Sequence, residues 1–366
     1  MPPKITLFTL GGTIASTAAD RANGARVSLT GDDLVRSVPE VRALAEIEVR
    51  AFRQVPSGDL RMDNLVELAR AIDECLANGS DSVVVTQGTD TLEETSFVLD
   101  LLVNDERPVI VTGAMRNPSL PGADGPANLL ASVRVATSGL TRGMGAVVVF
   151  NDEIHAARLV RKRHSTSTAA IGSPLSGPLG HVVEDVVRIF LKPPGRLTVR
   201  LPARVPDIAV GMVSIGFDDD GRLVRQAAAA GYDGLVLAAF GGGHVPASVV
   251  PALELLSRAI PVVLSSRAPA GPTLRHTYSY AGGEIDLIRR GLIPSGALDA
   301  VHARILLQVL LMAGVERPEI AAAFEDVLTA LGTRVIGSAE RVNRPEPLSL
   351  AAVKPQSTAH EKRGNA

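Results

Sequence analysis

The chain has 366 residues, of which 46% are apolar and 21% charged, so it can bury a large core, and its length favours two domains over one. The formal net charge of −2 leaves no basic excess for nucleic acid and no bias toward an anionic membrane. These numbers predict a soluble globular protein whose ligand is a small molecule.

The cysteine content and the apolar runs indicate the compartment in which the protein works. Its single cysteine, Cys75, excludes an internal disulfide and is typical of a reducing environment. The chain enters a predicted strand at Ile5 without a preceding apolar run of secretory length. No stretch approaches the roughly eighteen uncharged apolar residues of a transmembrane helix. We therefore expect a cytoplasmic protein with no membrane segment.

Strands and helices alternate along the first half of the chain. Apolar runs predict strands at 4–9, 46–52, 82–86, 109–113 and 146–150, and capped or amphipathic segments predict helices at 30–38, 62–78, 91–102 and from Asp124 onward. Residues 13–30 are small and polar, which predicts a loop of the length that functional lids have. The alternation predicts an α/β fold, with a doubly wound, mostly parallel sheet in a larger N-terminal domain over residues 1–190.

The second half of the chain predicts a smaller unit of the same class. Residues 191–207 are rich in proline and are the best candidate for a linker. Residues 208–337 then predict a smaller α/β C-terminal domain, with strands at 209–214, 234–238 and 261–265 and helices at 219–229, 246–258, 295–313 and 318–331. Residues 338–366 are polar and are expected to form a flexible tail.

Two threonine-bearing turns follow predicted strands of the first domain. One has the sequence TLGGTIA and contains Thr13, and the other has the sequence VTQGTDTLEET and contains Thr89. In the second turn, Thr91-Leu92-Glu93-Glu94 has the spacing of a capping box. Ligands of open α/β sheets bind beyond the carboxyl ends of the strands, so Thr13 and Thr89 can converge on one ligand if their strands are neighbours. Helix capping without chemistry explains the second turn equally well.

The residue types in these turns limit the possible chemistry. A threonine hydroxyl is a poor nucleophile at neutral pH, so catalysis would need a nearby base and N–H donors for an oxyanion. The seven histidines show no close ligand spacing with the cysteine or with one another, and Gly11-Gly12-Thr13 lacks the spacing of a dinucleotide or phosphate loop. We therefore expect neither a metal nor a cofactor.

Taken together, the two threonine motifs resemble those of the bacterial L-asparaginase family, whose members are threonine amidohydrolases. The resemblance runs from about Ile5 to Leu331 and leaves out only the tail. Five further stretches agree with it: Gly113-Ala114-Met115-Arg116, Asp124-Gly125-Pro126-Ala127-Asn128-Leu129, Asn151-Asp152-Glu153, Gly177-Pro178-Leu179-Gly180 and Ser265-Ser266-Arg267.

The resemblance implies two catalytic groups acting on L-asparagine. Thr13 corresponds to the nucleophile that attacks the side-chain amide carbon, forms a β-aspartyl ester and releases ammonia. Thr89, Asp90 and Lys162 correspond to the second group, in which the lysine would favour deprotonation of the threonine or of the attacking water. Apart from the resemblance, Lys162 stands in a basic run over residues 158–163 that would ordinarily be a solvated surface.

The resemblance also implies how substrate is bound. Asp90 would bind the α-ammonium group and Ser57 the α-carboxylate group. Glu284 corresponds to an acidic residue that reaches a neighbouring subunit's site, although it also has the character of a helix-start acid, and His244 stands where many members have Asn. The remaining positions of the expected substrate site are Gly12, Gly58, Thr89 and Ala114. Members usually assemble as a dimer of intimate dimers, so we expect a homo-oligomer, either a dimer or a homotetramer.

Two departures from the family pattern keep other functions open. Members usually carry a catalytic Tyr after the first motif, whereas residues 14–30 contain neither Tyr nor Phe, and Arg26 is nearest by position. Gly58 stands where many members have Gln, which affects recognition of the substrate amine. One alternative is therefore an amino-acid sensor that has lost turnover, and another is an amidohydrolase that prefers a different amide, such as glutamine.

Overall fold

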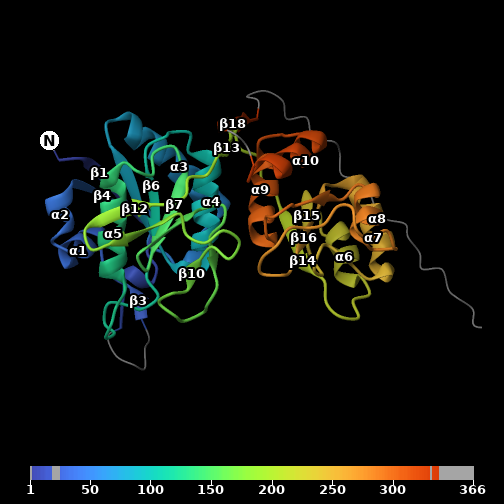
Figure 1. The fold of residues 1–366 in the computed structure, drawn as a ribbon, viewed down its shortest axis with the longest axis horizontal. Helices are drawn as coiled ribbons and strands as arrows, with labels where there is room; N and C mark the ends of the chain where they lie inside the picture. The colour runs from blue at the N-terminus through green and yellow to red at the C-terminus, as the bar shows by residue number, and fades with distance from the viewer. Residues whose placement is uncertain (1, 19–24, 330–331, 338–366) are drawn as a thin grey trace, which may run out of the picture.

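The computed structural model describes residues 2–18, 25–329 and 332–337, which form two α/β domains side by side (Figure 1). Residues 338–366, predicted to be a flexible tail, lie outside the described residues. Within the described ranges, no helix is both long and apolar enough to span a membrane. One mixed sheet and one parallel sheet, flanked by helices, confirm the predicted α/β class.

An eight-stranded sheet forms the centre of the first domain, in the order β12-β11-β8-β7-β6-β5-β1-β4. Five of its strands are parallel: β4 (Glu46–Ala51), β1 (Lys4–Thr9), β5 (Ser82–Thr86), β6 (Val109–Thr112) and β7 (Ala146–Phe150). Three strands not predicted from the sequence extend it antiparallel: β8 (Glu153–Ala156), β11 (Gly180–Val183) and β12 (Val186–Ile189). The parallel half carries the threonine turns at its carboxyl ends.

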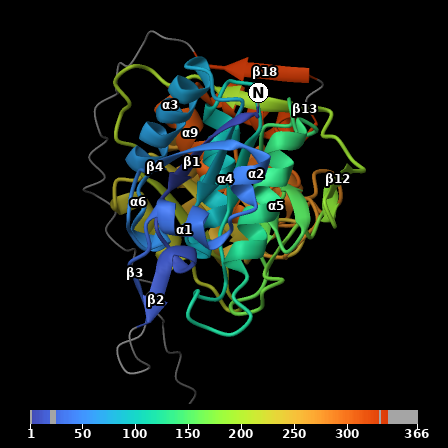
Figure 2. The ribbon, with the colours of Figure 1, turned by 90° about the vertical axis from the view of Figure 1, so that its left-hand side faces the viewer.

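Helices cover both faces of this sheet, as the doubly wound prediction requires. One face is covered by α1 (Gly31–Ser37), α2 (Val41–Leu44) and α5 (Gly125–Ser138), which lie on the near side in Figure 2, and the other by α3 (Met62–Ala77) and α4 (Leu92–Leu102). Local signals position two of these helices. Thr30 and Asp33 form a reciprocal capping box at α1, and Pro126 occupies the first turn of α5, where its missing N–H has no partner to lose.

The predicted loop after the first strand contains short elements. The 3-10 turn η1 (Thr13–Ala15) leads into β2 (Ser16–Ala18), which pairs antiparallel with β3 (Ala25–Val27). The expectation that residues 13–30 hold no regular element is therefore wrong for these segments. Their weak pattern hid them because a three-residue strand is specified by its pairing partner and not by its own periodicity.

The second domain has a parallel four-stranded sheet in the order β14-β15-β16-β17. Its strands are β14 (Val210–Ser214), β15 (Gly234–Ala239), β16 (Val262–Ser266) and β17 (Ile293–Pro294), and its helices are α6 (Arg222–Ala229), α7 (Val250–Ala259), α8 (Glu284–Arg289), α9 (Ala300–Met312) and α10 (Arg317–Asp326). The helix predicted from 295 begins at Ala300, because the Asp299 side chain accepts hydrogen bonds from the N–H groups of Val301 and His302 and so caps α9.

The two domains share a core in addition to their connecting chain. Within the segment predicted as a linker, residues 195–199 form β13 (Gly195–Val199), which pairs in parallel with β18 (Gly332–Ile336). Apolar side chains of α4, β13 and α9 then form one cluster that includes Phe97, Leu197 and Leu306. The helix that follows the second threonine turn therefore packs directly against the second domain.

Candidate active site

The two threonine turns meet at the carboxyl edge of the parallel sheet. Strands β1 and β5 are direct neighbours, so the turns that follow them leave the sheet side by side. Gly12 has a φ of 84°, and a Cβ placed on it would lie 2.0 Å from the backbone nitrogen of Gly88. Only a glycine permits this approach. The two strands are thus neighbours, and the structure brings together the turns that carry Thr13 and Thr89.

Ser57 lies in contact with the same pair of turns. It begins the 3-10 turn η2 (Ser57–Asp59) after β4, and its hydroxyl oxygen is 2.8 Å from where a Cβ on Gly88 would lie. The Thr91 hydroxyl donates a hydrogen bond of 2.9 Å to the Ser57 carbonyl. Thr91 ends the 3-10 turn η3 (Thr89–Thr91), and its side chain does not cap α4, so the predicted capping box is wrong. The hydroxyl stabilises the contact between η2 and η3 instead.

Lys162 supplies the charge at the second turn. It lies in β9 (Arg161–Lys162), which pairs antiparallel with β10 (Ile171–Gly172), and its Nζ lies 3.0 Å from Thr89 Oγ1 and 2.6 Å from Asp90 Oδ1. The lysine side chain is 16% exposed and the Asp90 side chain 80% exposed. An ammonium group that donates to a hydroxyl oxygen favours the deprotonated form of that hydroxyl. The structure therefore places Thr89, Asp90 and Lys162 in one cluster.

In the basic run around Lys162 only Arg163 is exposed, so the interpretation as a solvated surface is wrong for Arg158, Arg161 and Lys162. Arg158 is buried and pairs with the buried Asp100 of α4 at 3.1 Å. Arg161 pairs with Glu93 of α4 at 3.1 Å and with Asp299 of the second domain at 2.7 Å. Arg158 and Arg161 thus have carboxylate partners from other elements, which the local sequence cannot reveal.

Sequence reasoning gave no individual role to residues that form the wall beside Thr89. Its hydroxyl donates a 3.3 Å hydrogen bond to Met115 Sδ, in the turn that follows β6 and contains the buried Ala114. The carboxylate of Asp124 accepts the Met115 N–H at 2.9 Å. The Asn128 side chain donates to the Gly113 carbonyl at 3.0 Å. The stretches 113–116 and 124–129 therefore support each other, and only their resemblance to the family indicated a shared role.

Glu284 and His244 lie in the second domain, away from the threonine turns of the same chain. Glu284 begins α8, on the side of its domain that faces away from the first domain (Figure 1). Its Oε1 accepts the N–H groups of Thr277 and Tyr278 at 2.6 and 2.7 Å, and its Oε2 lies 3.1 Å from His244 Nε2. Burial alone would raise the pKa of Glu284, but these backbone hydrogen bonds hold that pKa below its usual range.

The arrangement contains groups that acyl transfer uses. Hydroxyl groups stand on adjacent turns, and an ammonium group contacts one of them. Among the residues that the structure describes, no group of three or more His, Cys, Asp or Glu side chains could hold a metal ion.

Two family descriptions match the chain in succession. Residues 4–195 match the family described as asparaginase, N-terminal, and residues 209–324 match the one described as glutaminase/asparaginase C-terminal domain. A protein of Bacillus licheniformis named L-asparaginase is 37% identical over 85% of this chain and 96% of its own length. A probable L-asparaginase of Deinococcus radiodurans is 36% identical over 88% of this chain and 97% of its own.

Other relatives extend the likeness to structure. A probable periplasmic L-asparaginase of Haemophilus influenzae is 34% identical over 88% of this chain and 93% of its own. The crystal structure of a probable cytoplasmic L-asparaginase from Campylobacter jejuni superposes with a TM-score of 0.78 and 29% identity, covering 88% of this chain and 99% of that one. With both domains matched in order and relatives aligned along nearly their whole length, the chain belongs to the asparaginase family.

Proposed function

We propose that the protein hydrolyses L-asparagine to L-aspartate and ammonia at the paired threonine turns, with Thr13 as nucleophile. One observation carries the proposal: Lys162 Nζ contacts Thr89 and Asp90 on a turn whose backbone packs directly against the turn that bears Thr13. A family of asparaginases, with relatives named L-asparaginase, supplies the substrate class.

The first step forms an ester. The Thr13 oxygen attacks the side-chain amide carbon of asparagine. The resulting oxyanion accepts hydrogen bonds from backbone N–H groups of the glycine-rich turns. The C–N bond then breaks, and the departing nitrogen takes up the proton that the Thr13 hydroxyl lost, so that ammonia leaves. An aspartyl group remains esterified to Thr13.

The second step returns the free enzyme. Water attacks the ester carbon, the Thr13 oxygen leaves with a proton, and aspartate is released. Thr89 takes up the proton of the attacking water. Its oxygen accepts a hydrogen bond of 3.0 Å from the Lys162 ammonium group, and this contact stabilises the charge left when the Thr89 hydroxyl is deprotonated.

Charged ends of the substrate have matching groups on the same turns. Asp90 is paired with Lys162 on one oxygen and is otherwise largely exposed, so it can also accept the α-ammonium group of an amino acid. The Ser57 hydroxyl would bind the α-carboxylate group. The backbone of Gly12, Gly58 and Ala114 would complete the pocket, because small residues allow the ligand to approach the main chain.

The proposed function also carries an expected oligomeric state and an expected cellular location for the protein. Within one chain α8, which begins at Glu284, lies on the side of the second domain that faces away from the first domain, so a homo-oligomer, a dimer or a tetramer, would allow Glu284 and its partner His244 to approach the turns of another copy. A cytoplasmic location is supported by the single buried cysteine and by the name of the Campylobacter jejuni neighbour. Sedimentation of the purified protein and cell fractionation test these two points.

The decisive experiment measures ammonia release from L-asparagine by the purified protein, with L-glutamine in parallel. Thr13→Val and Thr89→Val remove each hydroxyl while keeping the β-branched shape, and both should abolish release. Hydroxylamine should convert the ester on Thr13 into aspartyl hydroxamate in the wild type and not in Thr13→Val. Asparagine binding without ammonia release would instead support a sensor.

A further inference from the structure

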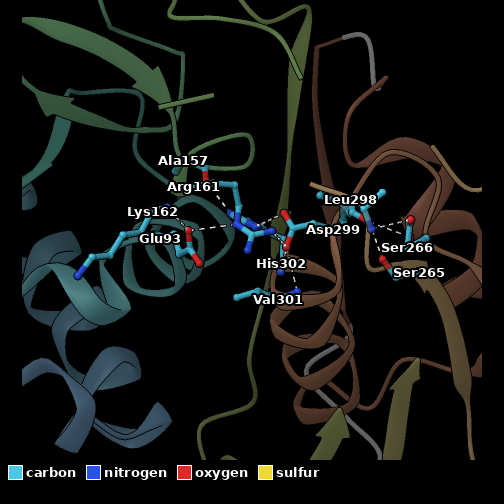
Figure 3. Close-up of polar contacts among 12 residues, drawn as sticks. Glu93, Ala157, Arg161, Lys162, Ser265, Ser266, Leu298, Asp299, Val301 and His302 are labelled. Atoms are coloured by element: carbon cyan, nitrogen blue, oxygen red, sulfur yellow. Dashed lines mark hydrogen bonds and ion pairs between the residues drawn. The ribbon is translucent and has the colours of Figure 1, made fainter. Parts of the chain in front are cut away.

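A chain of alternating charges connects the catalytic lysine to the second domain (Figure 3). Glu93 Oε2 accepts the backbone N–H of Lys162 at 2.5 Å and Arg161 Nε at 3.1 Å. Arg161 Nη1 then reaches Asp299 Oδ1 at 2.7 Å, and Asp299 Oδ2 lies 2.7 Å from His302 Nδ1. Two acids of different domains are thus bridged by one guanidinium group.

The hydrogen-bond partners of His302 define its charge. Its Nε2 lies 3.2 Å from the Ala157 carbonyl of the first domain, and its Nδ1 faces the Asp299 carboxylate. A carbonyl and a carboxylate can only accept, so both ring nitrogens must carry a proton. His302 is therefore an imidazolium, although it is fully buried. Opposite charges alternate along Glu93, Arg161, Asp299 and His302, which compensates for removing each from water.

At the first-domain end, the chain fixes the backbone that carries the lysine. Glu93 lies in the first turn of α4, directly after the 3-10 turn that holds Thr89 and Asp90. By accepting the Lys162 N–H, its carboxylate holds β9 at a set distance from that turn. Displacement of Glu93 would therefore change the separation between Lys162 Nζ and the Thr89 hydroxyl.

At the second-domain end, the chain is anchored on rigid elements. Asp299 caps α9, and the residue before it, Leu298, accepts hydrogen bonds through its carbonyl from Ser265 at 3.0 Å and Ser295 at 2.8 Å. Ser265 lies in β16, within the Ser265-Ser266-Arg267 stretch, whose last residue follows the strand. The His302 ring also packs on Phe97 of α4, with 5.0 Å between ring centroids. The second domain therefore presents Asp299 to Arg161 from a fixed position.

We propose that Asp299, through Arg161 and Glu93, is a positioning residue through which the second domain holds the catalytic lysine against Thr89. None of these three side chains contacts substrate in this scheme. Their role is to fix the Lys162 backbone. The inference rests on the proposed function in one respect, which is that the contact between Lys162 and Thr89 takes part in catalysis. A displacement of about 1 Å at a reacting group can lower a rate by about a hundredfold, so the effect should be visible in kcat.

The sharpest variant is Asp299→Asn. Its side-chain oxygen still caps α9, but the charge that pairs with Arg161 and His302 is gone. We expect kcat for L-asparagine to fall about tenfold to a hundredfold, with KM nearly unchanged, because the affected group is the lysine and not the substrate pocket. Arg161→Lys should act in the same direction, since one ammonium group cannot bond to both carboxylates as the guanidinium fork does.

A readout that does not use substrate separates this inference from the proposed function. Competitive labelling with an amine-reactive reagent, analysed by peptide mass, compares Lys162 with the exposed Lys192. Lys162 should label slowly in the wild type, because its amine contacts Thr89 and Asp90, and several-fold faster relative to Lys192 in Asp299→Asn. A wild type that releases no ammonia would refute the proposed function, while this ratio would still decide the positioning role.

Asp100→Asn is the matched control. It removes the charge of another buried ion pair, between Asp100 of α4, the helix that also carries Glu93, and Arg158, which has no contact with Lys162 among the interactions that the structure describes. We expect Asp100→Asn to lose about as much stability as Asp299→Asn while its kcat and its labelling ratio stay unchanged. The inference is overturned if Asp299→Asn and Arg161→Lys leave both readouts at the wild-type level, or if Asp100→Asn changes them equally.

Discussion

The contact between the two threonine turns is tested most directly by Gly12→Ala. The new Cβ would lie 2.0 Å from the Gly88 nitrogen and 2.3 Å from its Cα, and both are backbone atoms that cannot rotate away. Gly12 also has a φ of 84° and a ψ of −173°, a combination that side-chain-bearing residues almost never adopt. The substitution therefore forces one turn to move relative to the other.

The magnitude follows from these two terms. Backbone strain of this kind costs about 1–3 kcal/mol, and overpacking against atoms that cannot yield costs about 1–3 kcal/mol more, so we expect a loss of about 2–6 kcal/mol in the free energy of unfolding. Because the shift separates the threonine turns, ammonia release should also fall by about a hundredfold or more. Urea unfolding and an ammonia assay measure the two effects.

Gly139→Ala provides the matched control for Gly12→Ala. Gly139 ends α5 with a φ of 66°, and no heavy atom lies within 4 Å of a Cβ placed there. This variant should lose only about 1 kcal/mol, from left-handed strain, and keep full kcat. If Gly12→Ala is no less stable and no less active than Gly139→Ala, the two turns do not touch as described, and the site built on their contact is wrong.

Three further predictions concern single charges. Lys162→Met should lower kcat about a hundredfold to ten-thousandfold without changing the melting temperature greatly, and a kcat within threefold of wild type would contradict its role. Burial, with a contribution from the neighbouring Glu93, raises the pKa of Glu94 from 4.5 to about 6, so the protein should lose up to about 2 kcal/mol of stability as pH rises through that window. Glu94→Gln should remove this loss in urea unfolding at pH 7.5 and at pH 4.5, and equal pH dependence in both proteins would refute the assignment. Burial lowers the pKa of His155 from 6.5 to about 4, so the free energy of unfolding should fall by about 3 kcal/mol as pH drops across that range. His155→Gln should show a smaller fall. A variant whose stability depends on pH as steeply as that of the wild type would show that His155 is not the group responsible.

Local signals in the sequence were enough to locate the elements of the parallel sheet and their helices. Strands β1, β5, β6 and β7 lie within a residue of their predicted bounds. Each is a run of apolar residues that ends at a glycine or a polar residue, so its bounds can be predicted from the local sequence without knowledge of the neighbouring strands. The start of α5 at Asp124-Gly125-Pro126 was predictable for the same reason, since proline is favoured in the first helical turn whatever packs around it.

Pairing between distant segments could not be derived from the residues alone. The strands β8, β11 and β13 are specified by their neighbours in the sheet, and the Thr91 hydroxyl bonds to Ser57 instead of capping its helix because η2 lies within reach. The contact of Lys162 with Thr89, 73 residues apart, was indicated only by the resemblance to the family.

The sequence by itself determined the parallel strands of the first sheet and most of the helices, the presence of two threonine turns, and the family that the chain resembles, since each of these depends on short-range composition and spacing. Only the tertiary structure decided that Arg161 bridges two domains, that His302 is a buried imidazolium, and that Glu284 is held by its own loop. The physical reason is that the charge and hydrogen bonding of a side chain depend on the groups that folding places beside it, and those groups lie far away along the chain.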